Sequence, residues 1–470
     1  MTIATDIARR ITTMHYPDLP ADAVHWAKVA FIDTLACALA GAHEDAPRIA
    51  AKVAASYGGT GPALLWGTNR RMSALDAAVI NGTAGHALDY DDVNNTIGGH
   101  PSVPILPAII ALGEMLGASG KDLLLAYVTG FEAQAAIGKA VNVYHYRKGW
   151  HPTATLGVFG AAAASARLLN LSVPHTATTL AIAASLSSGI KANFGTMTKP
   201  LHAGHCSRNG LYAALMAKEG FTASNDAFEH PHGFFELFNG AGNYHVEKIL
   251  EHWAAPLDVL APGIGLKQYP CCASTHSAID ATLLLRERHH LTPERVKKIE
   301  TITHAPALAH TNRPDPKTAL DAKFSVQYCV ARALMHGAVT FDHFADSALL
   351  QPELRSLLAR VEAHPHAQLP KDMGDHYQGV VNITTTDGQQ YSARVDQPLR
   401  GPTNLAPPDR LESKFRDCAA RALRPQAVPR LYEQLCNFES LSNVRELTDF
   451  MQSSVIDAKT NREAAQPTLS

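Results

Sequence analysis

The sequence predicts a mainly α protein, with a large all-α helical domain and a smaller α+β domain. Three observations predict this fold class. Apolar helical runs fill the first 220 residues, strand-like alternation follows Pro262, and helical patterning returns after Asp409. A chain of 470 residues exceeds the size of one hydrophobic core, so we expect it to divide into about two or three domains.

Helical periodicity dominates the N-terminal part of the chain. Glycine, a common stop signal, follows three of the runs, at Gly41, Gly117 and Gly220. Stretches such as GVFGAAAASARLL carry small residues on more than one side, so these helices should pack closely inside a bundle. In order, the expected helices are 21–40, 72–92, 103–116, 121–141, 155–171, 175–190 and 205–219.

The smaller domain combines strands and helices. Residues 296–303 alternate apolar and polar side chains, as a strand does, and 379–395 predicts a β-hairpin that turns at Asp387–Gly388. Helical patterns are expected in between, over 274–288, 318–336 and 350–361.

Domain boundaries follow from these patterns. We expect 1–264 to form the first part of the helical domain, 265–398 the α+β domain, and 399–458 the return to the helical domain. The α+β domain is then an insertion. The polar stretch 459–470 predicts a disordered tail.

Composition argues against several classes of protein. The 41 basic and 43 acidic residues nearly cancel and form no basic run, so neither nucleic acid nor an anionic membrane is expected as a partner. The first twenty residues lack the apolar core of a signal peptide, and no uninterrupted apolar run approaches a membrane span. Seven cysteines without a regular CxxC pattern fit a reducing compartment better than a disulfide framework or a structural zinc. We therefore expect a cytoplasmic protein.

The segment 85–107 carries a dense group of ionisable side chains between two apolar helices: His86, Asp89, Asp91, Asp92 and His100. If the helix 72–92 continues to its predicted end, His86 and Asp89 share one face, as do Asp89 and Asp92. A carboxylate beside an imidazole fixes its tautomer and raises its basicity. Because ionisable groups are rarely buried without partners, the segment predicts a polar cavity with a chemical role.

Two segments further along carry more candidates. His151 precedes Pro152 at the expected start of a helix, where free backbone N–H groups favour an anion; the residue fits a helix cap equally well. Lys199 is expected in a loop between apolar helices, close to His202, and faces either a cavity or solvent.

A third segment, KQYPCCASTH, lies where the second domain begins. It places Lys267, Cys272 and His276 at a junction where they could close over a site. The chain has no GxGxxG, Walker or GxSxG motif. Lysine and imidazolium groups hold carboxylates, and a neutral imidazole removes or returns a proton. The inventory therefore fits a small, multiply charged acid and chemistry without a nucleotide.

Four ordered motifs carry a resemblance: GHALDYDD followed by GHPS, GWHPTATLGVFGAAAA, TKPLHAGHCSRNG, and KQYPCCASTH followed by DAKFSVQY. Together they resemble the MmgE/PrpD family, which includes 2-methylcitrate dehydratase, cis-aconitate decarboxylase and iminodisuccinate epimerase. The similarity runs across nearly the whole chain. It implies a homodimer whose subunits have a helical domain, formed from both chain ends, and a smaller α+β lid. It also implies an active site between them that uses no cofactor.

The resemblance further implies site residues. The family's active-site positions fall on Asp89, His100, His151, Lys199 and Lys267. Where the decarboxylase has a His, a Tyr and a Thr, this chain has Cys272, His310 and Val93, and its motifs resemble the epimerase most. We expect catalytic roles for Asp89, His100, His151, Lys199 and Cys272, and substrate contacts for Lys267, His276 and His310.

The expected function is therefore that of a cofactor-independent lyase or isomerase. It would abstract a proton next to a carboxylate of a small di- or tricarboxylate, and the outcome stays open between epimerisation, dehydration and decarboxylation. Two alternatives remain. One is a catalytically inactive protein that binds a carboxylate; the other is a metal-dependent hydrolase or lyase whose ligands are His86, Asp89, Asp92 and His100.

Overall fold

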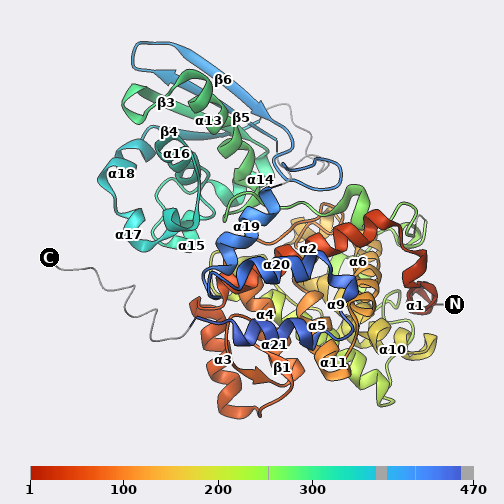
Figure 1. Cartoon of the computed structure of the whole chain (residues 1–470). Helices are drawn as coiled ribbons and strands as arrows, with labels where there is room; N and C mark the ends of the chain where they lie inside the picture. The colour runs from red at the N-terminus through yellow and green to blue at the C-terminus, as the bar shows by residue number, and fades with distance from the viewer. Residues whose placement is uncertain (1, 252, 367–377, 408, 457–470) are drawn as a thin grey trace. The chain divides into compact units, whose positions relative to one another are not determined.

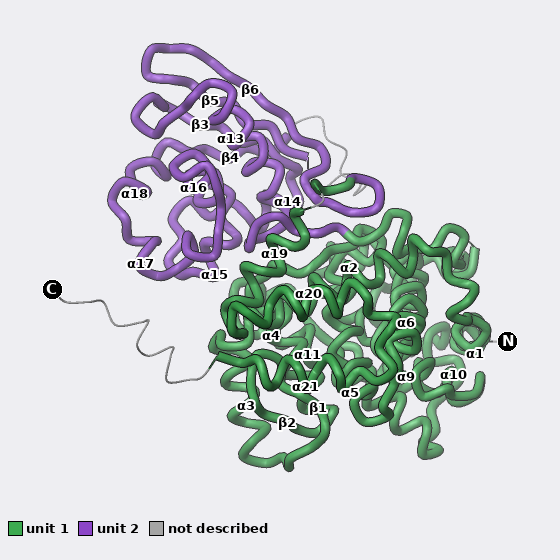
Figure 2. The backbone as a smooth tube through the Cα atoms, viewed as in Figure 1, with its two compact units in different colours: residues 1–264, 405–470 green, residues 265–404 purple. Residues whose placement is uncertain are grey.

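The computed structural model describes residues 2–251, 253–366, 378–407 and 409–456, which divide between two compact units. Unit 1 comprises 1–264 and 405–470, and unit 2 comprises 265–404 (Figure 2). The stretch 459–470, predicted to be a disordered tail, lies outside the described residues.

Unit 1 is built almost entirely of helices (Figure 1). The long α6 and the Ala-rich α9 are buried around most of their circumference, because their small side chains let neighbouring helices approach closely. A short antiparallel pair of strands, β1 Ala63–Leu64 and β2 Arg71–Met72, belongs to the same unit. The helices are α1 Ile3–Thr13, α2 Ala21–Gly41, α3 Asp45–Tyr57, α4 Ala74–Ala87, α5 Leu106–Leu116, α6 Gly120–Val141, α7 Tyr144–Lys148, α8 Pro152–Thr155, α9 Gly157–Leu168, α10 Val173–Leu186, α11 Thr198–Lys218, α12 Phe234–Asn239, α19 Arg410–Ala419, α20 Val428–Cys436 and α21 Arg445–Ser453.

Two predicted helix boundaries near the candidate residues are wrong. The helix expected over 72–92 ends at Ala87, because Asp89 adopts a left-handed backbone conformation with φ of 53°. The helix expected to begin at His205 begins at Thr198 instead, so Lys199 lies in its first turn and not in a loop. The shared helical face predicted for residues 86, 89 and 92 therefore does not form.

Helix α2 is the one described helix that is long and apolar enough, by length and composition, to cross a membrane. Of its most apolar window, 78% is buried inside the structure. Asp33, near its middle, is buried and forms an ion pair with Lys414 of α19. The apolar surface of α2 is thus largely covered within the fold.

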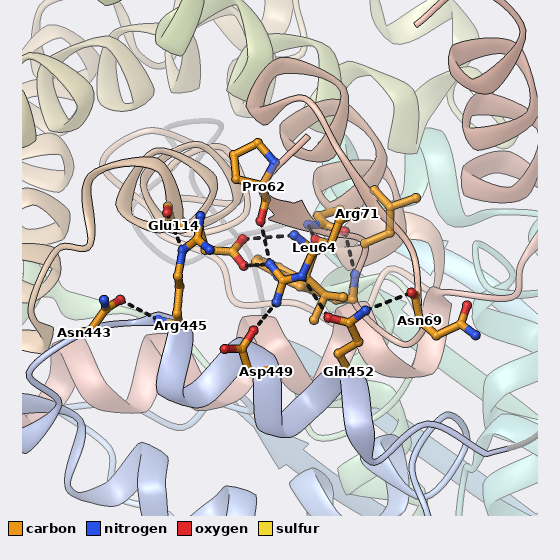
Figure 3. Close-up of polar contacts among 12 residues, drawn as sticks. Pro62, Leu64, Asn69, Arg71, Glu114, Asn443, Arg445, Asp449 and Gln452 are labelled. Atoms are coloured by element: carbon orange, nitrogen blue, oxygen red, sulfur yellow. Dashed lines mark hydrogen bonds and ion pairs between the residues drawn. The ribbon is translucent and has the colours of Figure 1, made fainter. Parts of the chain in front are cut away.

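The C-terminal helices return to the first part of unit 1 through a polar cluster centred on Arg71 (Figure 3). The Arg71 guanidinium donates to Glu114 of α5 at 2.7 Å, and to Asp449 and Gln452 of α21 at 2.5 and 2.8 Å. Arg445 of α21 donates in turn to the backbone carbonyl of Glu114 at 2.8 Å. The three bonds made with α21 join segments more than 300 residues apart, so both chain ends build one unit.

Unit 2 contains a four-stranded sheet in the order β4-β3-β5-β6. Strand β3 pairs in parallel with β4 and antiparallel with β5, while β5 and β6 form the predicted hairpin around Gly388, whose φ is 86°. The strands are β3 Val296–Thr303, β4 Val361–Pro365, β5 Gly379–Thr385 and β6 Gln390–Val395. The helices of this unit are α13 His276–His289, α14 Ala305–Thr311, α15 Ala319–Ala322, α16 Val326–His336, α17 Asp346–Leu349 and α18 Pro352–Leu358.

Three details of unit 2 differ from the prediction. The helix expected over 350–361 stops at Leu358, and the chain continues into β4. The helix expected over 318–336 is interrupted, because the Ser325 side chain accepts a bond from the Tyr328 N–H and caps a new helix. The unit extends beyond 398 to residue 404, where backbone bonds join Leu266 to Arg400 and close its end.

Candidate active site

Close contact between α4 and α11 sets the position of the candidate residues in unit 1. A Cβ atom at Gly204 would lie 2.0 Å from the Val79 carbonyl oxygen, and one at Gly82 would lie 2.7 Å from the Gly204 Cα. Only glycine permits so close an approach at these positions. Since the two helices run antiparallel, this register brings Lys199, in the first turn of α11, against His86, in the last turn of α4.

His86, Lys199 and two carboxylates form a connected buried cluster. The Lys199 Nζ donates to His86 Nε2 at 2.8 Å and to Asp89 Oδ1 at 2.6 Å. The opposite edge of the His86 ring, Nδ1, lies 3.0 Å from both oxygens of Asp91. Because the Lys199 ammonium donates a hydrogen bond to His86 Nε2, that nitrogen must offer its lone pair. The ring hydrogen of neutral His86 is therefore assigned to Nδ1, which donates to Asp91.

His100 is the second imidazole held by Asp91. Its Nδ1 lies 3.0 Å from Asp91 Oδ2, its Nε2 lies 3.7 Å from Asp89 Oδ1, and its ring packs edge-on against His86 with centroids 4.4 Å apart. Burial alone would raise the pKa of Asp91, but the imidazoles of His100 and His86 outweigh it and hold that pKa well below its usual range. Asp91 is thus an ionised carboxylate that orients both rings.

Burial disfavours the charged form of two imidazoles of this cluster, His86 and His151. It lowers the pKa of His86 to about 3, with the charge of Lys199 acting in the same direction. Burial and Lys199 likewise lower the pKa of His151 well below its usual value. The site therefore combines neutral imidazoles, which accept protons, with a buried ammonium group, which attracts a carboxylate.

His151 immediately precedes α8, makes no side-chain capping bond there, and faces this cluster. Its ring stacks on His86 with centroids 5.8 Å apart and meets the ring of Phe194 edge-on at 4.8 Å. Its Nδ1 lies 3.1 Å from Nδ1 of His202, which belongs to α11. Asp89, His100, His151 and Lys199, all predicted as catalytic, are thus gathered in one place within unit 1.

The metal-ligand set considered from the sequence is wrong in one member. Asp92 points elsewhere and accepts the Ser102 hydroxyl at 2.5 Å, and that hydroxyl lies 2.7 Å from the Tyr127 hydroxyl. The ligand atoms that do gather within 4.8 Å of one another belong to His86, Asp89, Asp91 and His100. Lys199 already places its ammonium group on two of these four side chains, so a divalent cation would have to displace it.

The remaining predicted residues lie in unit 2, around the segment 271–276. Cys272 is nearly buried, and its backbone N–H donates to the Lys323 carbonyl at 2.9 Å. The His310 Nε2 lies 3.3 Å from the hydroxyl of Ser274, so His310 and Cys272 flank the same short turn. Lys267 is buried as well.

His276 contacts the neighbouring residue Cys271. Its Nε2 lies 3.3 Å from the Cys271 carbonyl oxygen, and its ring packs edge-on against Tyr269 with centroids 5.1 Å apart. The Cys271 thiol lies 3.3 Å from the Thr275 hydroxyl.

Sequence reasoning gave no catalytic role to three residues that the structure places in the cluster. His86 entered as a member of the dense ionisable segment and as a metal ligand, Asp91 only as part of that segment, and His202 only as a neighbour of Lys199. A signal was present for His202: in a helix that begins before Lys199, residues 199 and 202 share a face.

Comparison with known proteins identifies the same family as the four sequence motifs. The MmgE/PrpD N-terminal domain matches residues 5–247, and the MmgE/PrpD C-terminal domain matches 269–436. The chain is 30% identical to the cis-aconitate decarboxylase of Homo sapiens over 96% of its own length and 95% of that protein. It is 27% identical to the cis-aconitate decarboxylase-like protein oryM of Aspergillus oryzae, over 95% and 96% of the two chains. It is 25% identical to the cis-aconitate decarboxylase of Aspergillus terreus, over 96% of each.

The two domain matches together span most of the chain. The relatives are named as enzymes, and the alignments cover almost their full length. The alternative of a catalytically inactive binding protein is therefore not supported. This protein, with its mainly α architecture and these matches, is an enzyme and belongs to the MmgE/PrpD family.

Proposed function

We propose that this enzyme moves a proton on the carbon next to a carboxylate of a small di- or tricarboxylate, without a cofactor. One observation carries the proposal: a single buried cluster holds neutral imidazoles directly beside the ammonium group of Lys199. A buried ammonium attracts a substrate carboxylate, and the neutral imidazole beside it then removes a proton from the adjacent carbon.

Each residue of the cluster has a role in this proposal. Lys199 anchors a substrate carboxylate, and His151 is the base: its Nδ1 is engaged by His202, and we assign its Nε2, on the other edge of the ring, to the substrate. Asp91 holds the rings of His86 and His100 in fixed orientations. An oriented imidazole loses less entropy when it meets the substrate, which favours reaction.

The outcome within the family is a further part of the proposal. The relatives' printed names make decarboxylation of cis-aconitate the first reaction to test. The resemblance to the decarboxylase departs at Val93, Cys272 and His310, so we propose that cis-aconitate is a poor substrate and that epimerisation is the favoured outcome. An epimerase needs bases on opposite faces of one carbon, and we propose His151 as one of them and Cys272, which the family resemblance assigns to the active site, as the other.

Cellular context and assembly are proposed from the same family resemblance. We propose a cytoplasmic homodimer that binds neither nucleic acid nor membrane as a partner. The odd number of cysteines supports a reducing compartment, the near-zero net charge supports the absence of such partners, and the homodimer rests on the resemblance alone.

The role of His151 is tested by His151→Asn. Loss of a general base should lower turnover by about 10²–10⁴-fold with little change in KM. His145→Asn is the matched control, since His145 is equally buried but bonds Asn239 and Thr155 instead of the cluster. Wild-type turnover by His151→Asn, with the fold intact by circular dichroism, would contradict the proposal.

A further inference from the structure

The contact between His151 and His202 joins a buried ring to a ring nearer the surface. Their Nδ1 atoms are 3.1 Å apart, within hydrogen-bond distance. His151 is buried, whereas His202 is partly exposed. His202 lies on α11 and also packs against Gly189, where an added Cβ would lie 3.5 Å from its ring.

Because the two imidazoles face each other through their Nδ1 atoms, one hydrogen atom lies in the hydrogen bond between them. One Nδ1 must carry the hydrogen and the other must offer its lone pair, so the tautomers of His151 and His202 are coupled. When His151 donates from Nδ1, its Nε2 holds a lone pair and is a base. His202 then has its own hydrogen on Nε2, on the opposite edge of its ring.

The charged and titratable neighbours keep both rings neutral at rest. Burial is the main cause that lowers the pKa of His202, to about 4. Lys199 and His205, which lie on the same helix α11, act in the same direction. His151 faces Lys199, and also His86 and His100 from α4 and the segment after it. When this pair takes up a proton, burial and the nearby Lys and His side chains disfavour the resulting charged imidazole, which therefore releases the proton readily.

From this geometry we propose that His202 is the proton outlet of His151, and that it carries the proton removed from the substrate toward solvent. The inference rests on the proposed role of His151 as the base. His151 Nε2 takes the substrate proton, and the Nδ1 proton of His151 passes to Nδ1 of His202. The Nε2 proton of His202 then leaves to water. Each ring gains one proton and loses one, and no electron is transferred.

Substitution His202→Asn tests the outlet. The amide oxygen of Asn keeps an acceptor for the His151 Nδ1 hydrogen, but it cannot take up a proton. Turnover should fall about tenfold or more while KM changes little, and added imidazole buffer should restore it. The fraction of recovered substrate that carries solvent deuterium in D₂O should also fall, because the proton stays on His151 and returns to the carbon from which it was removed.

His175→Asn is the control, since His175 is an exposed histidine on α10 of the same unit and its Nδ1 contacts the Ser172 hydroxyl instead of the cluster. It should behave like the wild type, whose turnover should not depend on imidazole concentration. Unchanged turnover of His202→Asn, or a loss that imidazole does not reverse, would overturn the outlet. Failure of the proposed function is a separate result: the wild-type enzyme would then move no proton on any carboxylate tested.

Discussion

Replacement of Lys414 by Met removes one half of a buried ion pair in unit 1. The Lys414 Nζ lies 2.6 Å from Asp33 Oδ1 of α2, donates to the Tyr90 carbonyl at 2.8 Å and stands 3.8 Å from the centre of the Tyr90 ring. Met fills a similar volume without charge. Asp33 is then left buried with the carboxyl groups of Asp91 and Asp92 among its neighbours.

The expected cost is large because the lost partner is fully enclosed. Breaking a buried pair from one side costs about 3–5 kcal/mol, whereas an exposed pair contributes about 0–1 kcal/mol. Unit 1 has about 330 residues, and an unfolding entropy of roughly 2.1 cal/mol/K per residue converts this cost to a fall in Tm of about 4–7 °C.

The loss should depend on pH. Burial raises the pKa of Asp33, and Lys414 is the main group that opposes this shift. Without Lys414 the folded-state pKa of Asp33 lies further above its unfolded value. The stability of the variant is then greatest below the unfolded pKa and falls as the pH rises toward the folded-state pKa. The deficit relative to the wild type should be larger at pH 7.5 than at pH 5.

Thermal melts followed by circular dichroism measure the effect. Arg48→Met is the control, since its pair with Asp45 is exposed on the same unit and should shift Tm by less than about 1 °C. The double variant Asp33→Asn with Lys414→Met should recover at least half of the loss, because it leaves no uncompensated charge. A Lys414→Met protein that melts with the wild type would refute this reasoning, as would a double variant that is no more stable.

Three further outcomes are expected. Gly204→Ala should destabilise unit 1 by about 1–3 kcal/mol in urea unfolding, because its Cβ meets backbone, whereas exposed Gly59→Ala has open space and should be neutral. Burial lowers the pKa of His145 to about 4, below its unfolded value, so its stabilising contribution is complete above pH 6.5 and is lost on acidification. His145→Asn should then reduce the slope of unfolding free energy between pH 6 and 4.5 by about 1.4 kcal/mol per unit, and an unchanged slope would contradict this. Cys272→Ser should abolish most activity and Cys271→Ser should spare it; full activity of Cys272→Ser would disprove a chemical role.

Much of the fold could be predicted from local patterns. The hairpin turn at Asp387–Gly388 was predicted because a turn of this kind needs a positive φ, which Gly388 adopts. Strand β4 was missed, because its five residues, VEAHP, directly follow a helical pattern and are too few to establish a strand period of their own. The early end of α4 was missed for a different reason: Asp89 turns the chain with a left-handed conformation that Asp only occasionally adopts.

The site could be predicted as a set of residues but not as a set of contacts. Asp89, His100, His151 and Lys199 were all recognisable from motifs. In the structure one carboxylate, Asp91, orients two imidazole rings. This arrangement depends on the turn after α4, which brings residues 91 and 100 back toward His86. Such a turn is a tertiary feature, and the spacing of residues along a helix does not reveal it.

Deuterium uptake from D₂O tests the central claim most directly. Purified enzyme, with a chelator present, is incubated with small di- and tricarboxylates that include cis-aconitate, and the products are followed by proton NMR. We predict deuterium on the carbon next to a carboxylate in at least one compound, and no such uptake with His151→Asn. No deuterium in any compound, or uptake only after a divalent metal is added, would contradict proton transfer by this imidazole and ammonium cluster.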